Sequence, residues 1–256
     1  MSESEKGYNI LCSLLILFCF LYILPANPVY AEQTVEYWYE KGQKLHTQGL
    51  CGDAILAYEQ LLNLDPHNSA ALNNIGNIFS DMGNYSAALD YYERAREGNL
   101  NDPIILGNIG RVLFLLGRYE EAEEILQETL IIDPEHEIAL YYLATTYYKL
   151  NKYHDAECLF NKTLILNESF ALAWNNLGNV YLMQGENDQA YSSYLRAVNE
   201  DRNLTQGWYN LGILLFESGK FCQSARAFYE VKMLAPKDTD ALHKEQLAQK
   251  YCLPHE

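Results

Sequence analysis

The chain has 256 residues, of which 49% are hydrophobic and 20% are charged, and its formal net charge is −16. This composition excludes a wholly disordered protein. The acidic balance excludes nucleic-acid binding, because phosphates require clusters of lysine and arginine, and it disfavours anionic membrane surfaces for the same reason. We therefore expect a protein or peptide partner of neutral to basic character.

Residues 1–31 differ from the rest of the chain. Residues 8–24 form a nearly continuous apolar run without a charge, and the sequence Val29-Tyr30-Ala31 follows it. Signal-peptidase sites have small residues of this kind, but the leader before the run is not net positive, as export signals usually are. The run also falls within the length tolerated for a spanning helix. Residues 1–31 are thus predicted to be either a signal peptide or an N-terminal membrane anchor.

Both alternatives place the remainder of the chain outside the cytosol. Lys6 precedes the apolar run, whereas Glu32, Glu36 and Glu40 follow it, and positive charge is retained on the cytoplasmic side of a membrane. The protein is expected to be membrane-anchored and facing outside the cytosol, or to be exported after cleavage near Ala31.

From residue 35 onward the sequence repeats every 34 residues. In the fifth unit Trp174 stands at position 4, Gly178 at position 8, Ala190 at position 20 and Tyr194 at position 24. Six units follow each other without an insertion: 35–68, 69–102, 103–136, 137–170, 171–204 and 205–238. A fixed period of this length is typical of solenoids, in which each repeat needs its neighbours to bury its apolar face.

The spacing within a unit predicts two helices. Positions 4, 8 and 11 share one helical face, as do positions 20, 24 and 27. Small residues at positions 8 and 20 allow the two helices to cross closely, and large residues at positions 4 and 24 fill the space around the crossing. Since glycine and asparagine tolerate the left-handed conformation that ends a helix, turns are expected at Gly49, Gly83, Gly117, Asn151, Gly185 and Gly219. Asp-Pro pairs at 65–66 and 133–134 are expected to end the second helix of their units.

Residues 239–256 are predicted to form a capping helix, from Thr239 to Tyr251, and a short tail. This segment combines a few apolar residues with Lys244, Glu245 and several glutamines. One apolar edge would pack on the sixth repeat and the charged residues would meet solvent, as the end of a solenoid requires.

The pattern resembles the tetratricopeptide repeat (TPR) family: a large apolar residue, then Leu-Gly, and later an alanine, an aromatic residue and a proline. The proline of position 32 is present only as Pro66, Pro134 and Pro236. The resemblance covers nearly all of the chain beyond residue 34. It implies an all-α fold, a right-handed superhelix (α-solenoid) of six helix-turn-helix repeats closed by the capping helix. It also implies an interaction scaffold whose first helices line a concave groove.

The sequence contains no motif of an enzyme, a cofactor site or a metal site. A Gly-x-Gly-x-x-Gly motif, a phosphate-binding loop, a Gly-x-Ser-x-Gly motif and a Cys-x-x-Cys pair are all absent from it, although these are the short signatures that would indicate chemistry. His243, Cys252 and His255 are close in sequence but lack the spacing of metal ligands. We expect no catalysis, no cofactor and no bound metal.

The six cysteines do not indicate a disulfide framework. Cys51, Cys158 and Cys222 fall in different repeats, too far apart along a solenoid to be bridged. Cys222 and Cys252 are able to meet at the C-terminal end of the chain. Small buried thiols are the favoured expectation for all six.

One polar row stands where packing does not require an amide. Position 6 of the first helix, which faces away from the helix crossing, reads Glu40, Asn74, Asn108, Tyr142, Asn176 and Asn210. Stacked helices lie roughly 8–10 Å apart and an extended chain advances about 3.3 Å per residue, so one asparagine would meet a peptide about every third residue. An amide both donates and accepts, and can therefore pair with a peptide N–H and C=O together.

This row is similar to the asparagine ladder in the repeat region of the O-GlcNAc transferase family. The resemblance extends to the ladder alone and implies no transferase activity. The alternative interpretation is drift of the repeat consensus, in which asparagine recurs at this position without a ligand.

The predicted peptide-binding site consists of Asn74, Asn108, Asn176 and Asn210, with Asn73, Asn77, Arg111, Tyr141, Asn175, Asn179 and Tyr209 beside them in the groove. The carboxylate clamp that holds the C-terminus of heat-shock chaperones in some family members is not expected, because it needs several cations and Arg111 is nearly alone. The predicted function is a non-catalytic scaffold that binds an extended peptide segment of a partner in the groove. The alternative is an assembly factor or chaperone for a membrane protein complex, which docks folded subunits.

Overall fold

The computed structural model describes residues 34–252, and this part of the chain forms thirteen helices and no strand. The predicted signal peptide or anchor, residues 1–31, lies outside the described residues. Between residues 34 and 252, no helix combines the length and the apolar character needed to cross a membrane.

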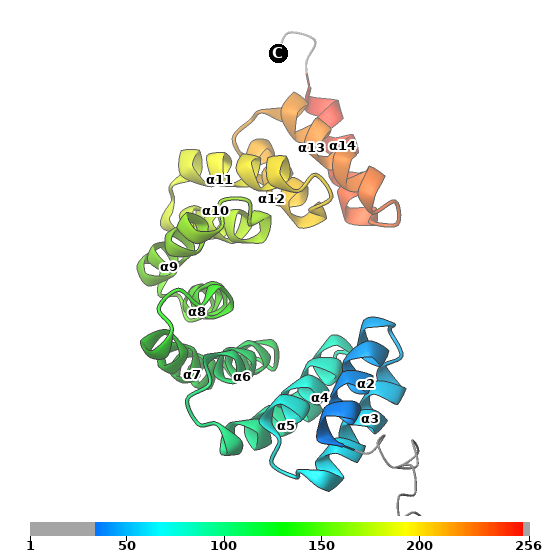
Figure 1. The fold of residues 1–256 in the computed structure, drawn as a ribbon. Coiled ribbons are helices and arrows are strands. Elements are labelled where there is room, and N and C mark those ends of the chain that lie inside the picture. The colour runs from blue at the N-terminus through cyan, green and yellow to red at the C-terminus, as the bar shows by residue number, and fades with distance from the viewer. Residues whose placement is uncertain (1–33, 253–256) are drawn as a thin grey trace, which may run out of the picture.

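Six helical hairpins follow each other at the period of the sequence repeat. Their first helices are α2 (Val35–Thr47), α4 (Ser69–Asp81), α6 (Pro103–Leu115), α8 (Glu137–Lys149), α10 (Ala171–Gln184) and α12 (Thr205–Glu217). Their second helices are α3 (Cys51–Leu64), α5 (Tyr85–Gly98), α7 (Tyr119–Ile132), α9 (Tyr153–Leu166), α11 (Asn187–Glu200) and α13 (Phe221–Leu234). The helix α14 (Thr239–Tyr251) follows α13. The hairpins stack into an open arc (Figure 1), which confirms the predicted all-α superhelix.

The turns inside the hairpins have the backbone conformation that their residues favour. The five turn glycines have φ angles between +74° and +81°, and Asn151 has a φ of +58°. The two Asp-Pro pairs follow the last residues of α3 and α7, Leu64 and Ile132. The predicted turn and stop signals are therefore confirmed.

The two helices of a hairpin cross at the small residue of position 8. A Cβ atom added to Gly178 would lie 2.6 Å from the ring of Tyr194, and one added to Gly76 would lie 2.5 Å from the ring of Tyr92. The residue at position 24 is buried in all six hairpins: Tyr58, Tyr92, Leu126, Phe160, Tyr194 and Phe228. The predicted crossing is thus confirmed, because the ring occupies the space that a larger residue at position 8 would need.

The packing of the cap corrects its prediction. The buried residues of α14 are Ala241, Glu245 and Ala248. Glu245 was expected in solvent, but it is 3% exposed and accepts a hydrogen bond of 3.1 Å from Nζ of Lys232 on α13. Two alanines let α14 approach closely, and a buried carboxylate is tolerated because a cation of the neighbouring helix pairs with it.

The prediction that all cysteines are small buried thiols is wrong. Cys222, at the start of α13, forms a disulfide with Cys252, which follows α14. Cys158 is exposed and Cys51 is half-buried. The disulfide is geometrically possible because α14 runs back along α13, so that its C-terminal end returns to the N-terminal end of α13.

Two exposed glycines at the first turn give opposite stability predictions. Gly52→Ala is expected to raise the free energy of unfolding by about 0.5–1 kcal/mol, since the added Cβ meets nothing within 4 Å and the unfolded chain loses freedom. Gly49→Ala is expected to lower it by about 1 kcal/mol, because Gly49 has a φ of +75°. Urea unfolding followed by circular dichroism measures both changes. A destabilised Gly52→Ala variant would contradict this assignment.

Candidate functional site

The first helices of the hairpins line the inner side of the arc. Figure 1 shows α6 and α8 inside α7 and α9. In each first helix, positions 2, 6, 9 and 13 fall on one stripe at about 100° per residue, and this stripe lies opposite positions 4 and 11, which pack on the second helix. We term these stripes on α4, α6, α8, α10 and α12 the inner face.

The helices that form the inner face are nearly free of charge. Their charged residues are Asp81, Arg111, Glu137, Lys149 and Glu217, three acids and two bases. The first helix of the first hairpin, α2, is not counted in the inner face and carries two acids and two bases: Glu36, Glu40, Lys41 and Lys44. The neighbouring outer helix α7 alone carries five glutamates and no base. The net charge of −16 therefore arises mainly outside the inner helices, which offer amide, aromatic and aliphatic groups instead.

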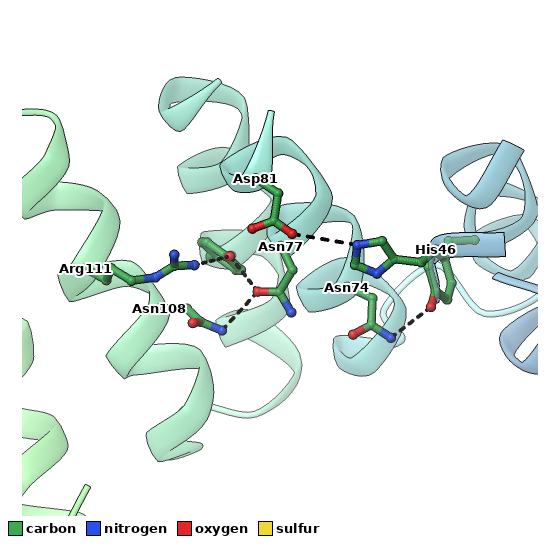
Figure 2. Close-up of polar contacts among 8 residues, drawn as sticks. His46, Asn74, Asn77, Asp81, Asn108 and Arg111 are labelled. Carbon is green, nitrogen blue, oxygen red and sulfur yellow. Dashed lines mark hydrogen bonds and ion pairs between the residues drawn. The ribbon is translucent and has the colours of Figure 1, made fainter. Parts of the chain in front are cut away.

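The predicted asparagines are bonded to one another across repeats. Nδ2 of Asn108 on α6 donates to Oδ1 of Asn73 at 3.0 Å and to Oδ1 of Asn77 at 3.4 Å, both on α4. The hydroxyl of Tyr92 on α5 donates to the same Oδ1 of Asn77 at 2.7 Å. Figure 2 shows Asn108 and Asn77 joined between their two helices. Asn77 therefore accepts from both its own hairpin and the next one.

The same arrangement recurs three repeats later. Nδ2 of Asn210 donates to Oδ1 of Asn175 at 3.0 Å and to Oδ1 of Asn179 at 3.1 Å, and the hydroxyl of Tyr194 donates to Asn179 at 2.7 Å. We term these two sets the amide networks: Asn73, Asn77, Asn108 and Tyr92 form the first, and Asn175, Asn179, Asn210 and Tyr194 the second. Asn108 and Asn175 are only 7% and 3% exposed. The hydrogen bonds of the networks that join adjacent repeats therefore involve buried amides.

The inference that packing does not require an amide at position 6 is therefore wrong. Asn108 and Asn210 use both hydrogens of Nδ2 within the protein. Asn74 and Asn176 use one each, to the hydroxyls of Tyr58 and Tyr141. Each of these two asparagines keeps one N–H that donates to none of the residues that the structure describes, and Oδ1 of Asn74 accepts no hydrogen bond from them.

Sequence reasoning missed the tyrosine hydroxyls behind the inner face. Position 9 is asparagine in the second and fifth hairpins, as Asn77 and Asn179, and in both of them position 24 is tyrosine. The two hairpins with phenylalanine at position 24 have Thr145 and Ile213 at position 9 instead. This pairing between positions 9 and 24 is a signal within the single chain, because a buried hydroxyl requires an acceptor.

Between the two amide networks the inner face carries one aromatic ring, which contacts aromatic rings beside the face. Tyr142 on α8 replaces the asparagine of position 6, and its ring centroid lies 5.6 Å from that of Phe114 and 5.2 Å from that of Tyr141. Tyr209, the remaining predicted aromatic residue, donates its hydroxyl to Asp240 of α14. Tyr209 therefore joins the sixth repeat to the cap and is not part of either network.

Arg111 lies beside the first amide network. Its Nη2 donates to the hydroxyl of Tyr92 at 3.4 Å, and Figure 2 shows the guanidinium pointing toward α4. Within residues 34–252 it forms no ion pair, and its buried Nε has no hydrogen-bond partner. Arg111 thus retains donor capacity, but a lone guanidinium does not make the carboxylate clamp.

Burial raises the pKa of the tyrosines that support the inner face. It raises the pKa of Tyr58, of Tyr92 and of Tyr141 to about 12, and it also raises the pKa of Tyr194. The phenolate form is disfavoured because a buried site solvates charge poorly. These hydroxyls therefore remain hydrogen-bond donors and acceptors at any physiological pH.

The raised pKa values predict a loss of stability at alkaline pH. In the unfolded chain these tyrosines ionise near pH 10, whereas the folded protein keeps their protons until about pH 12. Stability is thus complete below pH 10 and is expected to fall between pH 10 and pH 12. Absorbance titration of the phenolate should show a late-ionising class of tyrosines that shrinks in the Tyr92→Phe variant. One step near pH 10 for all tyrosines would contradict the assignment.

Comparisons with known proteins agree with this architecture. Family models described as tetratricopeptide repeat match residues 69–97, 102–168 and 141–204, which together span about half of the chain. The chain belongs to the tetratricopeptide repeat family.

Solved structures show the same fold. The chain is similar to the APC/C hetero-tetramer Cut9–Hcn1, with a TM-score of 0.76 and 18% identity over 96% of this chain and 46% of that chain. It is also similar to PilF of Pseudomonas aeruginosa, with a TM-score of 0.71 and 19% identity over 84% and 96% of the two chains. YrrB, described as a TPR protein with an unusual peptide-binding site, gives a TM-score of 0.57 and 20% identity over 74% and 98%. These identities show the fold alone.

One curated relative matches in sequence over a short stretch. Protein O-mannosyl-transferase TMTC1 of Mus musculus is 40% identical over 60 residues, which are 23% of this chain and 6% of that protein. The match spans a small part of the transferase, so its activity does not transfer to this chain.

Proposed function

We propose that the protein is a non-catalytic scaffold that binds an extended, mostly uncharged peptide segment of another protein along its inner face. The observation that carries this proposal is the charge distribution, since the five inner helices from α4 to α12 carry only five charged residues in all, within a chain of net charge −16. A preformed surface of amides, aromatic rings and aliphatic groups binds a peptide at a low ordering cost. The peptide-binding site described for YrrB supports a peptide as the ligand of such a fold.

Within this proposal the asparagines have two different roles. Asn74 and Asn176 contact the peptide backbone, because each keeps an unused N–H. Asn108 and Asn210 hold adjacent repeats in register through the amide networks. The backbone of a ligand therefore forms hydrogen bonds with fewer asparagines than a continuous ladder would provide.

Partner capture from a membrane extract tests the inner face. The Asn74→Ala, Asn176→Ala double variant of the full chain is expected to capture its partner about tenfold less well, since two hydrogen bonds to the ligand are lost. The matched control is Asn63→Ala with Asn161→Ala, which changes two exposed asparagines of the outer helices α3 and α9. Equal capture by the double variant and the control would refute binding by these asparagines.

The disulfide supports a location outside the cytosol. Disulfides persist in oxidising compartments and are rare in the cytosol, and Cys222 is bonded to Cys252. We infer that the repeats face such a compartment, either anchored by residues 1–31 or released by cleavage near Ala31. Mass spectrometry of the mature N-terminus with membrane fractionation distinguishes these two forms. Free thiols at both positions in protein isolated without reductant would contradict the inference.

A second candidate is an assembly factor or chaperone that docks folded subunits of a membrane complex. It is favoured by Ile131 and Ile165, which occupy the same position of α7 and α9 and are both 82% exposed outside the inner face. Replacing both with serine should then reduce capture of an intact complex. Unchanged capture would remove this candidate.

A further inference from the structure

Exposed aliphatic side chains follow one edge of the inner face. Ile104, Ile138 and Leu172 occupy position 2 of α6, α8 and α10 and are 60%, 43% and 44% exposed. Together they are termed the aliphatic row. The same position is Glu36 in α2, Ala70 in α4 and Gln206 in α12, so the row is confined to the third, fourth and fifth repeats.

The fold does not account for the aliphatic row. Hairpins with alanine or glutamine at position 2 form the same crossing as those with isoleucine or leucine. Large aliphatic groups in water are unfavourable, and here three of them occupy equivalent positions of successive repeats. The polar amide networks flank the row, one between α4 and α6 and the other between α10 and α12.

The repeat of the row favours one conformation of its ligand. Packed helices in general lie roughly 8–10 Å apart, and this is the spacing taken for the row. A polyproline II chain has three residues per turn and rises about 3.1 Å per residue, so it presents the same side about every 9 Å. A β-strand presents the same side every second residue, or about every 6.6 Å, and residues three apart point to opposite faces. A polyproline II segment therefore keeps one side chain on each repeat, and a β-strand does not.

The surroundings of the row favour an uncharged ligand. Its three helices carry only Arg111, Glu137 and Lys149, and the carboxylate of Glu137 already accepts a hydrogen bond from Asn167. The ring of Tyr142, half-buried at position 6 of the central helix α8, shares the stripe of Ile138. Aromatic groups are the surfaces on which polyproline II segments commonly dock.

We propose that the aliphatic row determines specificity, and that it takes an uncharged polyproline II segment of the partner with an aliphatic residue at every third position. This inference rests on the proposed binding of a peptide by the inner face. Burial of the partner's aliphatic side chains against the row supplies the apolar part of the affinity. The unused N–H group of Asn74 supplies a backbone contact beyond the α6 end of the row, and that of Asn176 supplies one beside Leu172 on α10.

A display library of random linear 16-residue peptides, selected on the full chain, tests the row. Peptides recovered on the wild type are expected to carry aliphatic residues at three-residue intervals. They should bind the Ile104→Ser, Ile138→Ser, Leu172→Ser variant roughly tenfold less tightly or worse, because three apolar contacts are lost. The control variant, Ile131→Ser, Ile165→Ser and Leu166→Ser, changes exposed aliphatic groups of α7 and α9 and should bind as the wild type does.

The outcomes separate this inference from the function on which it rests. Recovered peptides that lack the three-residue interval, or that bind the row variant as tightly as the wild type, overturn the role of the row and leave peptide binding intact. Recovery of no peptide above background overturns peptide binding itself. Urea unfolding of both triple variants confirms that they are folded, since all six changed side chains are exposed.

Discussion

Replacing Cys222 and Cys252 with serine is expected to lower the stability of the C-terminal hairpin and cap by about 2–4 kcal/mol. The disulfide joins residues 30 apart in sequence and holds the end of α14 to the start of α13. Because each repeat of a solenoid is stabilised by its direct neighbours, the loss should fall on α13 and α14 first. Hydrogen exchange should show faster exchange of α14 amides and little change in α4 or α6.

The chain offers a matched control for this variant. Cys51 and Cys158 are free thiols, so Cys51→Ser with Cys158→Ser removes two sulfurs without removing a cross-link. The cap retains the Lys232–Glu245 ion pair and should loosen rather than detach. Equal protection of α14 in the disulfide variant and the wild type would contradict the stabilising role.

Asn179→Ala is expected to lower the free energy of unfolding by about 1–3 kcal/mol, because it removes the acceptor of a buried hydroxyl. Tyr194 is 1% exposed and donates to Asn179 at 2.7 Å. In a Tyr194→Phe background no hydroxyl is left without a partner, so the same substitution should cost less. A double-mutant cycle is expected to give a coupling energy of about 1 kcal/mol between the two sites.

The cycle also tests the hydrogen bond between the two residues directly. If Asn179 and Tyr194 did not interact, removal of Asn179 would cost the same with and without the hydroxyl of Tyr194. The exposed Asn161 of α9 provides the reference, since Asn161→Ala should change stability by less than about 0.5 kcal/mol. Additive costs at Asn179 and Tyr194 would contradict the amide network.

The helical hairpins were predictable because their determinants act locally. Gly178 and Tyr194 meet at one crossing within one repeat, so their spacing alone indicates the geometry. The turn at Asn151 was predictable for the same reason, since its left-handed backbone depends on the residue type and not on distant packing.

The amide networks were not predicted because they join three helices. Asn108 meets Asn73 and Asn77 only after two repeats have stacked with a definite rotation between them. The composition of position 6 drew attention to Asn108 and Asn210, but their bonds to the asparagines of the preceding repeat depend on the superhelix. The prediction counted four asparagines of position 6 as free to meet a ligand, whereas only Asn74 and Asn176 keep an unused N–H.

The capping helix has its predicted bounds, Thr239–Tyr251, but its packing was mispredicted for a related reason. The burial of Glu245 depends on Lys232 of a neighbouring helix, and the bond between Cys222 and Cys252 depends on the direction in which α14 returns. Neither relation has a local pattern in the sequence, where Glu245 resembles a solvated residue and both cysteines resemble ordinary thiols.

Photo-crosslinking in the native membrane fraction tests the central claim most directly. A photoreactive residue replaces Leu172 or Gln206 on the inner face, or Ile165 on the outer helix α9, and mass spectrometry identifies the attached residues of the partner. We predict that both inner positions attach to one short, uncharged stretch of a single partner, in sequence order, and that position 165 does not attach to it. Attachment from position 165 alone, or from the inner positions to scattered sites on a folded partner, would contradict binding of an extended segment along the inner face.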